Sequence, residues 1–505
     1  MDMNIKIKNL NLASLVWLTL GILVFLLGWC KWYLSIPLVL AAMVIMIKQY
    51  GQDSNETMHL SRKNFWIAFV ICFLLMGLSG IGGYVVQSAD NYWRNAMFRD
   101  LVNYSWPVYD STTGLTKSYY IAFWLVPALL AKLTHSMELG FFMQLLWVTI
   151  GFQLLYLQIC RYVGKPRLSY LAFFYLFSGL KIIECLLYLP LFGDGSFLSN
   201  MVNIVATNGS PGSFHAGPMV QFLYDPFNQT IPLCLGMMLM INEVRGNLLP
   251  FIFAVLLLYA PLPLIGLLPL VLYWFVRNII AVNPQHRLGY VFSLQNIVGL
   301  AILLVSAAYL MSNSNSGHKG LRPILNLRAD IYAFVIYMIF EFGIFMIIGY
   351  KACRDKVALW IAFVSVSLFG WFQLGLHNDF CFRTNMPFIF ILCLLVMRRY
   401  YMSETSKSMR IFIIAWYVMA GLPSQIHPTL RWLSSCYILS GHPQSELNNY
   451  QQFKDVTTLY VMQQTKLRND DLSSSFLCRP DQYEFRTDVG TPDSFFFKYL
   501  AKDIQ

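Results

Sequence analysis

Three polar stretches carry the residues whose chemistry stands out, and each lies between long apolar segments. The first stretch, 87–118, contains Asp90 four positions before Arg94. A carboxylate can act as a general base, and an arginine one helical turn later can pair with it or bind an anion. The alternative is that Asp90 only caps a helix, because aspartate is favoured at an N-cap. The adjacent Arg99 and Asp100 are interpreted as a surface ion pair.

The stretch 87–118 has an apolar and a polar side when it is read at helical spacing. The apolar stripe is Trp93, Met97, Leu101 and Tyr104, and the polar stripe is Asn91, Asn95, Arg99 and Asn103. This pattern predicts a helix that lies in a membrane interface, with its aromatic side in the headgroups and its polar side in water. Trp106-Pro107 is expected to end that helix, and Asp110 to Gly114 to form a turn.

The stretch 377–385 reads His377-Asn-Asp379-Phe-Cys-Phe-Arg383-Thr-Asn385. Asp379 and Arg383 are four residues apart, so they share one face of a helix. A guanidinium group can bind a phosphate through two parallel hydrogen bonds, which makes Arg383 the expected phosphate ligand. An ordinary capped helix end with solvated charges is the alternative.

The stretch 191–218 is rich in Gly, Ser and Pro and is expected to be irregular. It contains His215 and leads into Gln221 and Asp225 at the entrance of an apolar segment. Polar groups at such a depth usually face a cavity, because exposure to lipid costs several kcal/mol. A further polar stretch, 312–330, adds Arg322.

Three charged residues lie within apolar segments. Lys181 and Glu184 are three positions apart and are expected to neutralise one another, whereas Glu341 has no evident local partner. Such charges also line polar cavities or translocation paths in membrane proteins.

The composition predicts an integral membrane protein. The 505 residues are 57% hydrophobic and 12% charged, with a formal net charge of +11, whereas soluble domains have about 25% charged residues. The positive excess is attributed to loops on the cytoplasmic side, so no nucleic-acid partner is expected. The ten cysteines are scattered without a C-x-x-C motif, and Cys436 and Cys478 can pair only if the polar tail lies outside the cytoplasm.

The fold class expected is an all-α polytopic membrane protein with about 12–14 transmembrane helices, and with interfacial helices in the first large external loop. The apolar segments are 12–30, 33–48, 65–86, 119–134, 139–160, 168–190, 219–241, 250–260, 263–277, 292–311, 331–350, 357–376, 386–397 and 411–426. Basic clusters after many of these segments define the cytoplasmic side. With these clusters in the cytoplasm, 87–118 is external and Arg161 is internal, so 119–160 must cross the membrane an odd number of times. The segment 119–134, which contains Pro127, is therefore expected to be re-entrant or interfacial. Two full crossings by 119–160 remain the alternative.

The expected domain organisation has three parts. Residues 1–64 form a transmembrane hairpin and a cytoplasmic loop, 65–426 form the main transmembrane module, and 427–505 form a small external tail. The external loops of the module are 87–118, 191–218, 312–330 and 377–385. Within the tail, the aromatic residues of 495–500 are expected to dock on the membrane module.

The stretch 65–400 resembles the GT-C superfamily of polytopic membrane glycosyltransferases, as an uncharacterised bacterial branch. The resemblance rests on Asp90 followed by an amphipathic helix, on Trp106-Pro107, and on the Tyr119-Tyr120 entry to the next segment. The segments 119–134 and 139–160, and Asn378 to Pro387, also resemble members of this general build. Two features depart from the superfamily pattern. The hairpin 12–48 is additional, and the paired acidic motif is reduced to Asp90-Asn91.

The resemblance implies an inverting glycosyltransferase at the external face of the bacterial cytoplasmic membrane, with a polyprenyl-phosphate-linked sugar donor and a glycan or lipid acceptor. Asp90 would be the catalytic base, and Arg383, with Arg94 or Arg322, would bind the donor phosphate. The substrate-binding residues expected are Trp93, Trp106, Tyr109, His215, Gln221, Asp225, His377 and Asp379. No cofactor is expected, although the spacing leaves a divalent metal open.

Two other functions remain as alternatives. A transporter or flippase of a lipid-linked or anionic glycan would use Lys181, Glu184 and Glu341. A glycan polymerase or ligase would share the chemistry of the transferase, and the sequence does not separate transfer of one sugar from transfer of a chain.

Overall fold

The computed structural model describes residues 2–53, 56–85, 89–111, 114–243, 248–313, 322–324, 327–374, 378–439 and 489–503. Within these residues, eight helices are long and apolar enough to cross a membrane. They span Ile7–Trp29, Trp32–Gln52, Met137–Val163, Pro261–Ala281, Pro284–Leu310, Arg328–Ala352, Asp379–Tyr401 and Lys407–Leu430. The predicted all-α polytopic membrane protein is therefore confirmed. The other apolar segments form shorter helices, so 12–14 crossings are reached only if these are counted.

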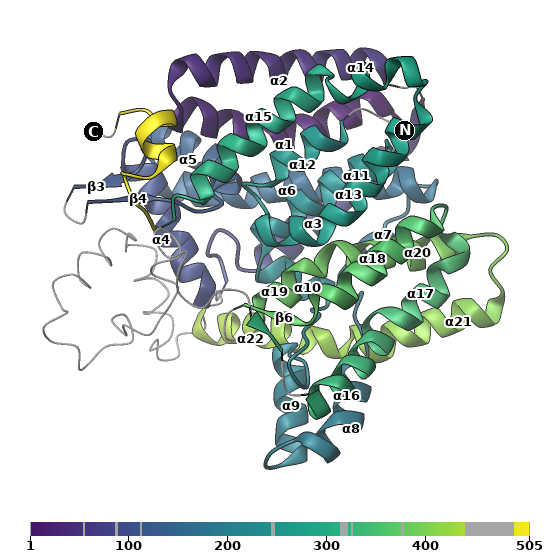
Figure 1. Ribbon diagram of the computed structural model, residues 1–505. Coiled ribbons are helices and arrows are strands. Elements are labelled where there is room, and N and C mark those ends of the chain that lie inside the picture. The colour runs from purple at the N-terminus through teal and green to yellow at the C-terminus, as the bar shows by residue number, and fades with distance from the viewer. Residues whose placement is uncertain are drawn as a thin grey trace, which may run out of the picture.

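The N-terminal part is a helical hairpin closed by a small ribbon. Its elements are β1 (Asp2–Lys6), α1 (Ile7–Trp29), α2 (Trp32–Gln52), β2 (Thr57–Ser61) and α3 (Arg62–Leu78). Strands β1 and β2 pair antiparallel, with Asn4 opposite His59. This ribbon marks one end of the helical bundle, which we call the β1 end (Figure 1).

The opposite end, which we call the α4 end, carries the next polar stretch. Its elements are α4 (Ala89–Asn103), β3 (Tyr109–Asp110), β4 (Leu115–Lys117), α5 (Ala122–Thr134) and α6 (Met137–Val163). The peptide bond between Trp106 and Pro107 is cis. Helix α6 begins at the cap Ser136, whose hydroxyl accepts a hydrogen bond from the Leu139 N–H at 3.2 Å.

The predicted helix in 87–118 exists as α4, and its predicted polar stripe is only partly exposed. Asn91 and Asn95 are buried, Arg99 is half-buried and Asn103 is exposed, while the Asp100 carboxylate is buried and pairs with Lys117 at 3.6 Å. The prediction of a solvated polar face was therefore wrong for Asn91 and Asn95, and the prediction of Asp100 as a surface residue was wrong. The reason is tertiary: α5 packs along α4, and β4 brings Lys117 to Asp100.

Helix α5 begins and ends near α4. Before it, Lys117 pairs with Asp100 of α4, and near its end the Lys132 ammonium donates to the Val102 carbonyl at 3.1 Å. Thirteen residues of helix extend about 20 Å, which is shorter than a membrane crossing requires. The re-entrant or interfacial placement of 119–134 stays a prediction.

The middle of the chain alternates short and long helices. They are α7 (Ser169–Tyr175), α8 (Lys181–Phe192), α9 (Phe197–Thr207), α10 (Met219–Tyr224), α11 (Phe227–Asn242), α12 (Leu249–Leu256), α13 (Pro261–Ala281), η1 (Pro284–His286), α14 (Arg287–Val291) and α15 (Leu294–Leu310). Helix α9 lies inside 191–218, so the prediction of an irregular stretch was wrong for 197–207. The Ser196 hydroxyl caps α9 and the left-handed Asn208 ends it, so local capping favours the helix.

The last part of the module lies below α1 and α2 in Figure 1. It contains β5 (Arg322–Pro323), α16 (Leu327–Tyr337), the π-helical turn η2 (Met338–Gly343), α17 (Ile344–Gly349), η3 (Tyr350–Ala352), α18 (Lys356–Phe369), β6 (Phe372–Gln373), α19 (Asp379–Thr384), α20 (Met386–Tyr401), α21 (Lys407–Trp416), the π-helical turn η4 (Tyr417–Gly421), η5 (Pro423–Gln425) and α22 (Ile426–Leu439). Strands β5 and β6 pair antiparallel.

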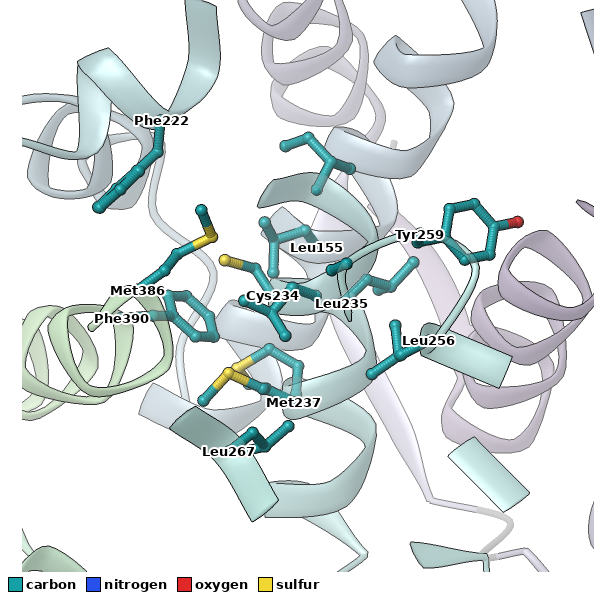
Figure 2. Packing of buried hydrophobic residues seen from close by; sticks show 14 of the residues in the cluster. Leu155, Phe222, Cys234, Leu235, Met237, Leu256, Tyr259, Leu267, Met386 and Phe390 are labelled. Carbon is teal, nitrogen blue, oxygen red and sulfur yellow. The ribbon is translucent and has the colours of Figure 1, made fainter. Parts of the chain in front are cut away.

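Helix α11 occupies the centre of the apolar core. Figure 2 shows its residues Cys234, Leu235 and Met237 between residues of α20 and residues of α12. A side chain at Gly236 would meet Leu256 of α12 at 2.7 Å, so the two helices are in close contact there. The buried faces are therefore within the protein, while side chains such as Ile47 and Ile347 remain exposed, as expected of lipid-facing positions.

The C-terminal residues 489–503 dock on the α4 end. Strand β7 (Val489–Gly490) extends the β3–β4 pair, and the π-helical turn η7 (Phe496–Leu500) follows. Phe496 is fully buried against Phe25 of α1 and Tyr309 of α15. The predicted docking of 495–500 is confirmed. The Cys478 thiol and the Cys436 side chain lie outside the described residues.

We expect Phe496→Ala to lower the free energy of unfolding by about 3–5 kcal/mol, because it opens a cavity between α1 and α15. Phe495→Ala is the matched control, since Phe495 is exposed, and it should shift stability by much less. Thermal unfolding of the two purified variants in detergent, followed by tryptophan fluorescence, measures the difference. Equal midpoints for both variants would contradict the docked arrangement.

Candidate functional site

Three interruptions of helical backbone meet inside the bundle. They precede α5, separate α10 from α11, and separate α12 from α13. The Ala122 N–H donates to the Leu258 carbonyl at 3.1 Å, and a side chain at Gly266 would come within 1.9 Å of the Thr384 carbonyl oxygen. Irregular backbone in a membrane protein is tolerated where it is buried or lines a polar cavity. This meeting point is therefore the first place to look for a site.

A tyrosine pair joins two of these interruptions. The Tyr120 hydroxyl accepts hydrogen bonds from Arg383 Nη1 at 2.9 Å and from Gln229 Nε2 at 3.2 Å. The rings of Tyr119 and Tyr120 stack with centroids 3.8 Å apart, and their hydroxyl groups are hydrogen-bonded. Tyr120 therefore connects α19 to the first turn of α11.

Arg383 lies between this buried pair and a more exposed carboxylate. Its Nη2 is 3.5 Å from Asp379 Oδ1, and the side-chain exposure rises from 15% at Arg383 to 50% at Asp379. The predicted spacing of the two residues on one helix is thus realised in α19. A guanidinium group presents several N–H donors in a fixed plane, so it is suited to binding an anion.

A second arginine reaches the same turn of α11 from α4. The guanidinium carbon of Arg94 lies 5.5 Å from the centroid of Phe227, the first residue of α11. Phe227 in turn contacts Phe123 and Trp124 of α5. Helix N-termini carry a partial positive charge that favours anions. The start of α11 therefore lies among aromatic rings, with Arg94 on one of them.

Asn228 lacks hydrogen-bond partners in the part of the chain that the structure describes. Its side chain is fully buried, and neither its amide oxygen nor its amide nitrogen is bonded there. In the same part, the Gln229 amide oxygen is also unbonded, although its nitrogen donates to Tyr120. An unsatisfied buried amide costs about 1–3 kcal/mol. Such groups call for an explanation, and a bound polar ligand or water is a common one.

We refer to Arg94, Tyr119, Tyr120, Asn228, Gln229 and Arg383 as the α11 cluster. Sequence reasoning named its two arginines but gave no role to Tyr120, Asn228 or Gln229. The available signal was an Asn-Gln pair at the start of an apolar segment, directly after Asp225-Pro226.

Asp90 lies in α4, one helical turn before Arg94. Its side chain, like those of Trp93 and Arg322, falls outside the described residues, and so does the whole of His377. The backbone therefore places Asp90 on the helix that carries Arg94 to the α11 cluster. For Arg322, the structure gives only its place in β5.

His215, Gln221 and Asp225 lie beside the α11 cluster. The His215 ring packs on Phe382, the neighbour of Arg383, with centroids 4.8 Å apart. Gln221 Nε2 lies 3.5 Å from Asp225 Oδ2, and Asp225 ends α10 just before α11. The backbone of the loop is held in place, because Asn385 donates to the His215 carbonyl at 3.4 Å.

Trp106 and Tyr109 lie apart from this region. The Trp106 ring packs on Trp29 with centroids 5.0 Å apart, and its indole N–H donates to the Leu101 carbonyl. Tyr109 pairs with Thr116 in the β3–β4 ribbon. The structure gives Trp106 a packing role between α1 and the end of α4.

Lys181, Glu184 and Glu341 form a second buried cluster. The Lys181 ammonium is 3.6 Å from Glu184 Oε2 and is in direct contact with Glu341 Oε1. The sequence predicted the first pair, while the partner of Glu341 emerges only when α8 packs beside η2. All three side chains are buried. Across the described residues, no three His, Cys, Asp or Glu side chains group as metal ligands.

A third polar cluster lies at the β1 end and borders a hollow of about 20 Å³, room for about one water molecule. Arg161 pairs with Glu243 at 2.5 Å, and Asn11 donates to Asp53 at 3.0 Å. Burial raises the pKa of the Asp53 carboxyl and Glu243 raises it further, while hydrogen bonds from Asn11 and Gln49 and the charge of Arg161 act in the opposite direction. These residues satisfy one another and fix the ends of α1, α2 and α11.

No family model matches this sequence, and no curated protein or solved structure matches it either. The eight apolar helices define the class, a multi-pass membrane protein.

We expect Asn228→Leu to leave the protein as stable as the wild type or more stable. The change removes an unpaired buried amide at nearly constant shape, which is neutral or stabilising for folding. Asn385→Leu is the contrasting variant, because the Asn385 amide donates to His215 and Tyr337, and it should destabilise by about 1–3 kcal/mol. Unfolding midpoints of both variants test this, and a marked loss of stability in Asn228→Leu would contradict it.

We expect the stability that Asp53 contributes to decrease as pH rises. A carboxyl whose pKa is raised on folding binds its proton more tightly in the native state. Its contribution is therefore full below the unfolded-state pKa and is lost as pH rises through the native pKa. Asp53→Asn should remove this loss, so the variant gains stability relative to the wild type toward neutral pH. Unfolding midpoints between about pH 4 and pH 8 measure it, with Glu404→Gln, at an exposed carboxylate, as the control.

Proposed function

We propose that this membrane protein is an inverting glycosyltransferase that uses a sugar linked to a lipid phosphate. The observation that carries the proposal is that two arginines lie near the first turn of α11: Arg94 packs on Phe227, and Arg383 shares the Tyr120 hydroxyl with Gln229. That turn also holds the buried and unpaired amide of Asn228. This combination suits a ligand with an anionic group and neighbouring hydroxyl groups.

The surroundings of the cluster support a lipid-borne donor. Aromatic rings pack beside the arginines: Phe227 lies against Arg94, and the Tyr120 hydroxyl bonds to Arg383. Tyr119 and Trp124 pack on these rings, and helices of the bundle expose apolar side chains. A polyprenyl chain can remain in lipid while its phosphate reaches the arginines. The proposed location is the external face of a bacterial cytoplasmic membrane, and the acceptor is a glycan or a lipid.

In the proposed reaction, Asp90 takes the proton of an acceptor hydroxyl group. The acceptor oxygen forms a bond to the anomeric carbon as the bond between that carbon and the phosphate oxygen breaks, which inverts the configuration. The departing phosphate keeps the electron pair, and its charge is stabilised by Arg383, Arg94 and the N-terminal end of α11. Asp90 fits the role of base because it lies one turn before Arg94 on the same helix.

We expect Asp90→Asn to lower the transfer rate by about 10²–10⁴-fold, as loss of a general base does. Asp194→Asn, which changes an exposed aspartate after α8, is the matched control and should keep full activity. The assay follows radiolabelled sugar from a panel of polyprenyl-phosphate donors into acceptors extracted from the producing cells. Normal transfer by Asp90→Asn would remove Asp90 as the base.

Arg383→Lys should lower the rate by about 10²–10³-fold, because one ammonium cannot replace a guanidinium aimed at a developing charge. Arg277→Lys provides the matched control, since Arg277 also pairs with an aspartate, Asp355, far along the chain. Equal activity of the two variants would argue against a role of Arg383 in phosphate binding.

Transport of a lipid-linked or anionic glycan is the second candidate, because the buried Lys181–Glu184–Glu341 cluster is of the kind found along translocation paths. It predicts that Glu341→Gln abolishes transfer of a fluorescent glycolipid across proteoliposome membranes, while Asp90→Asn does not. The glycosyltransferase proposal predicts the opposite sensitivity in the sugar-transfer assay. A polymerase or ligase would differ from the transferase in the length of glycan transferred, which mass spectrometry of the product determines.

A further inference from the structure

The buried Lys181–Glu184–Glu341 cluster holds two carboxylates and a single ammonium group. The Lys181 ammonium lies 3.6 Å from Glu184 Oε2 and contacts Glu341 Oε1 directly. Among the described residues, no other cation forms an ion pair with either carboxylate. If all three side chains were ionised, one negative charge would be left without a partner, although none of them is more than 7% exposed.

The groups around the cluster do not supply the missing positive charge. Those that interact with it electrostatically are the Cys185 thiol of α8, the Tyr337 hydroxyl of α16 and the Cys381 thiol of α19. Thiols and phenols are ordinarily neutral at neutral pH. The start of α8 offers a partial positive charge of about half a unit, which is less than the full unit required.

The loop before α10 adds a hydroxyl group to the cluster. Ser210 Oγ accepts a hydrogen bond from the Lys181 ammonium at 2.8 Å, and it carries no charge. His215 lies beyond Ser210, with Nδ1 at 3.1 Å from the serine hydroxyl. The serine therefore separates the imidazole from the two carboxylates.

The two carboxyl groups lie within hydrogen-bonding reach of one another. An ionised carboxylate can only accept hydrogen bonds, so a bond between two carboxyl groups forms only when one of them carries a proton. In the part of the chain that the structure describes, Glu184 Oε1 is buried and receives no hydrogen bond from a donor. The contact therefore has an oxygen atom at which a proton can be held.

The backbone brings the two carboxyl groups together. Glu184 lies in the first turn of α8, and Glu341 lies in the π-helical turn η2. Gly179, just before α8, lies against the Glu341 carboxylate, so a side chain at this position would overlap with it. Single π-helical turns often occur at functional sites. The contact thus follows from how α8 packs on η2.

The surroundings decide which charge state is stable. A buried charge without a partner is so costly that the group usually becomes neutral instead. Two carboxylates that share one site cannot both ionise, because like charges repel strongly at short distance. One added proton brings the cluster to a net charge of zero, with one carboxylate, one protonated carboxyl group and one ammonium group.

We propose that the Lys181–Glu184–Glu341 cluster is a proton-binding site, in which Glu184 and Glu341 share one proton at neutral pH beside the charged Lys181. The proton belongs to the pair of carboxyl groups and not to one residue. This proposal does not depend on the glycosyltransferase function, because it rests on the charges and contacts of the cluster alone.

Infrared spectroscopy tests the proposal, because the C=O stretch of a protonated carboxyl group is resolved from the bands of carboxylates and amides. Purified protein is measured at neutral pH in a detergent that has no carbonyl group. Glu184→Gln leaves Glu341 and Lys181 as a balanced pair, and Glu341→Gln leaves Glu184 and Lys181. We expect each of these nearly isosteric variants to lose one protonated carboxyl group per molecule relative to the wild type.

Glu404→Gln is the control for the substitution itself, since Glu404 is exposed, and it should keep the wild-type band. Lys181→Met tests the charge count from the other side. Without the ammonium group, both carboxyl groups need a proton, so the band should grow by one group per molecule.

Three results would overturn the proposal. The first is a wild-type spectrum without a protonated carboxyl group, which requires no variant. The second is a band of equal size in the wild type and in both glutamine variants. The third is a band lost in only one of the two variants, because the proton would then belong to that residue alone.

Discussion

The architecture depends on one constraint, which is that backbone N–H and C=O groups have no water to bond in the apolar interior of a membrane. A helix that stops inside the bundle must therefore stop against protein. Here the interruptions before α5, before α11 and between α12 and α13 stop against one another, as the bonds Ala122–Leu258 and Tyr120–Gln229 show. The result is a buried region where helix ends and polar side chains meet, which an uninterrupted bundle would not provide.

The polar stretch before α5 closes this region from one side. Helix α4 brings Arg94 to Phe227, and its carboxylate Asp100 is held by Lys117, with both side chains fully buried. A buried pair of this kind is weak evidence for stability, but loss of one partner is costly. The pair therefore fixes the register between α4 and β4 and, through it, the position from which Arg94 approaches α11.

Much of the fold could be predicted from hydropathy and periodicity, because burial in lipid and helical spacing are local properties of the sequence. These gave the membrane helices, the helix α4, and the i, i+4 pair of Asp379 and Arg383. The burial of Asn91 and Asp100 could not be predicted, because it depends on where β4 and α5 pack. Similarly, Tyr120 and Asn228 acquire their places only when α5, α11 and α19 meet. Helix α9 was not predicted, because the Gly and Ser residues on either side of it made all of 191–218 look irregular.

The six-residue helix α19 contacts both the α11 cluster and His215, which leads to the Lys181–Glu184–Glu341 cluster. Its Arg383 donates a hydrogen bond to Tyr120 in the α11 cluster. Its Phe382 packs on His215, and His215 is connected to Lys181 through Ser210. The helix itself is held at both ends: Asn378 adopts a left-handed conformation and caps its start, and α13 contacts its last residue through Gly266. Because α19 is short and fixed in this way, a shift on one side would be transmitted to the other. A change that moves His215 should therefore also alter the surroundings of Arg383, which is the physical reason to treat the two buried polar systems as parts of one site.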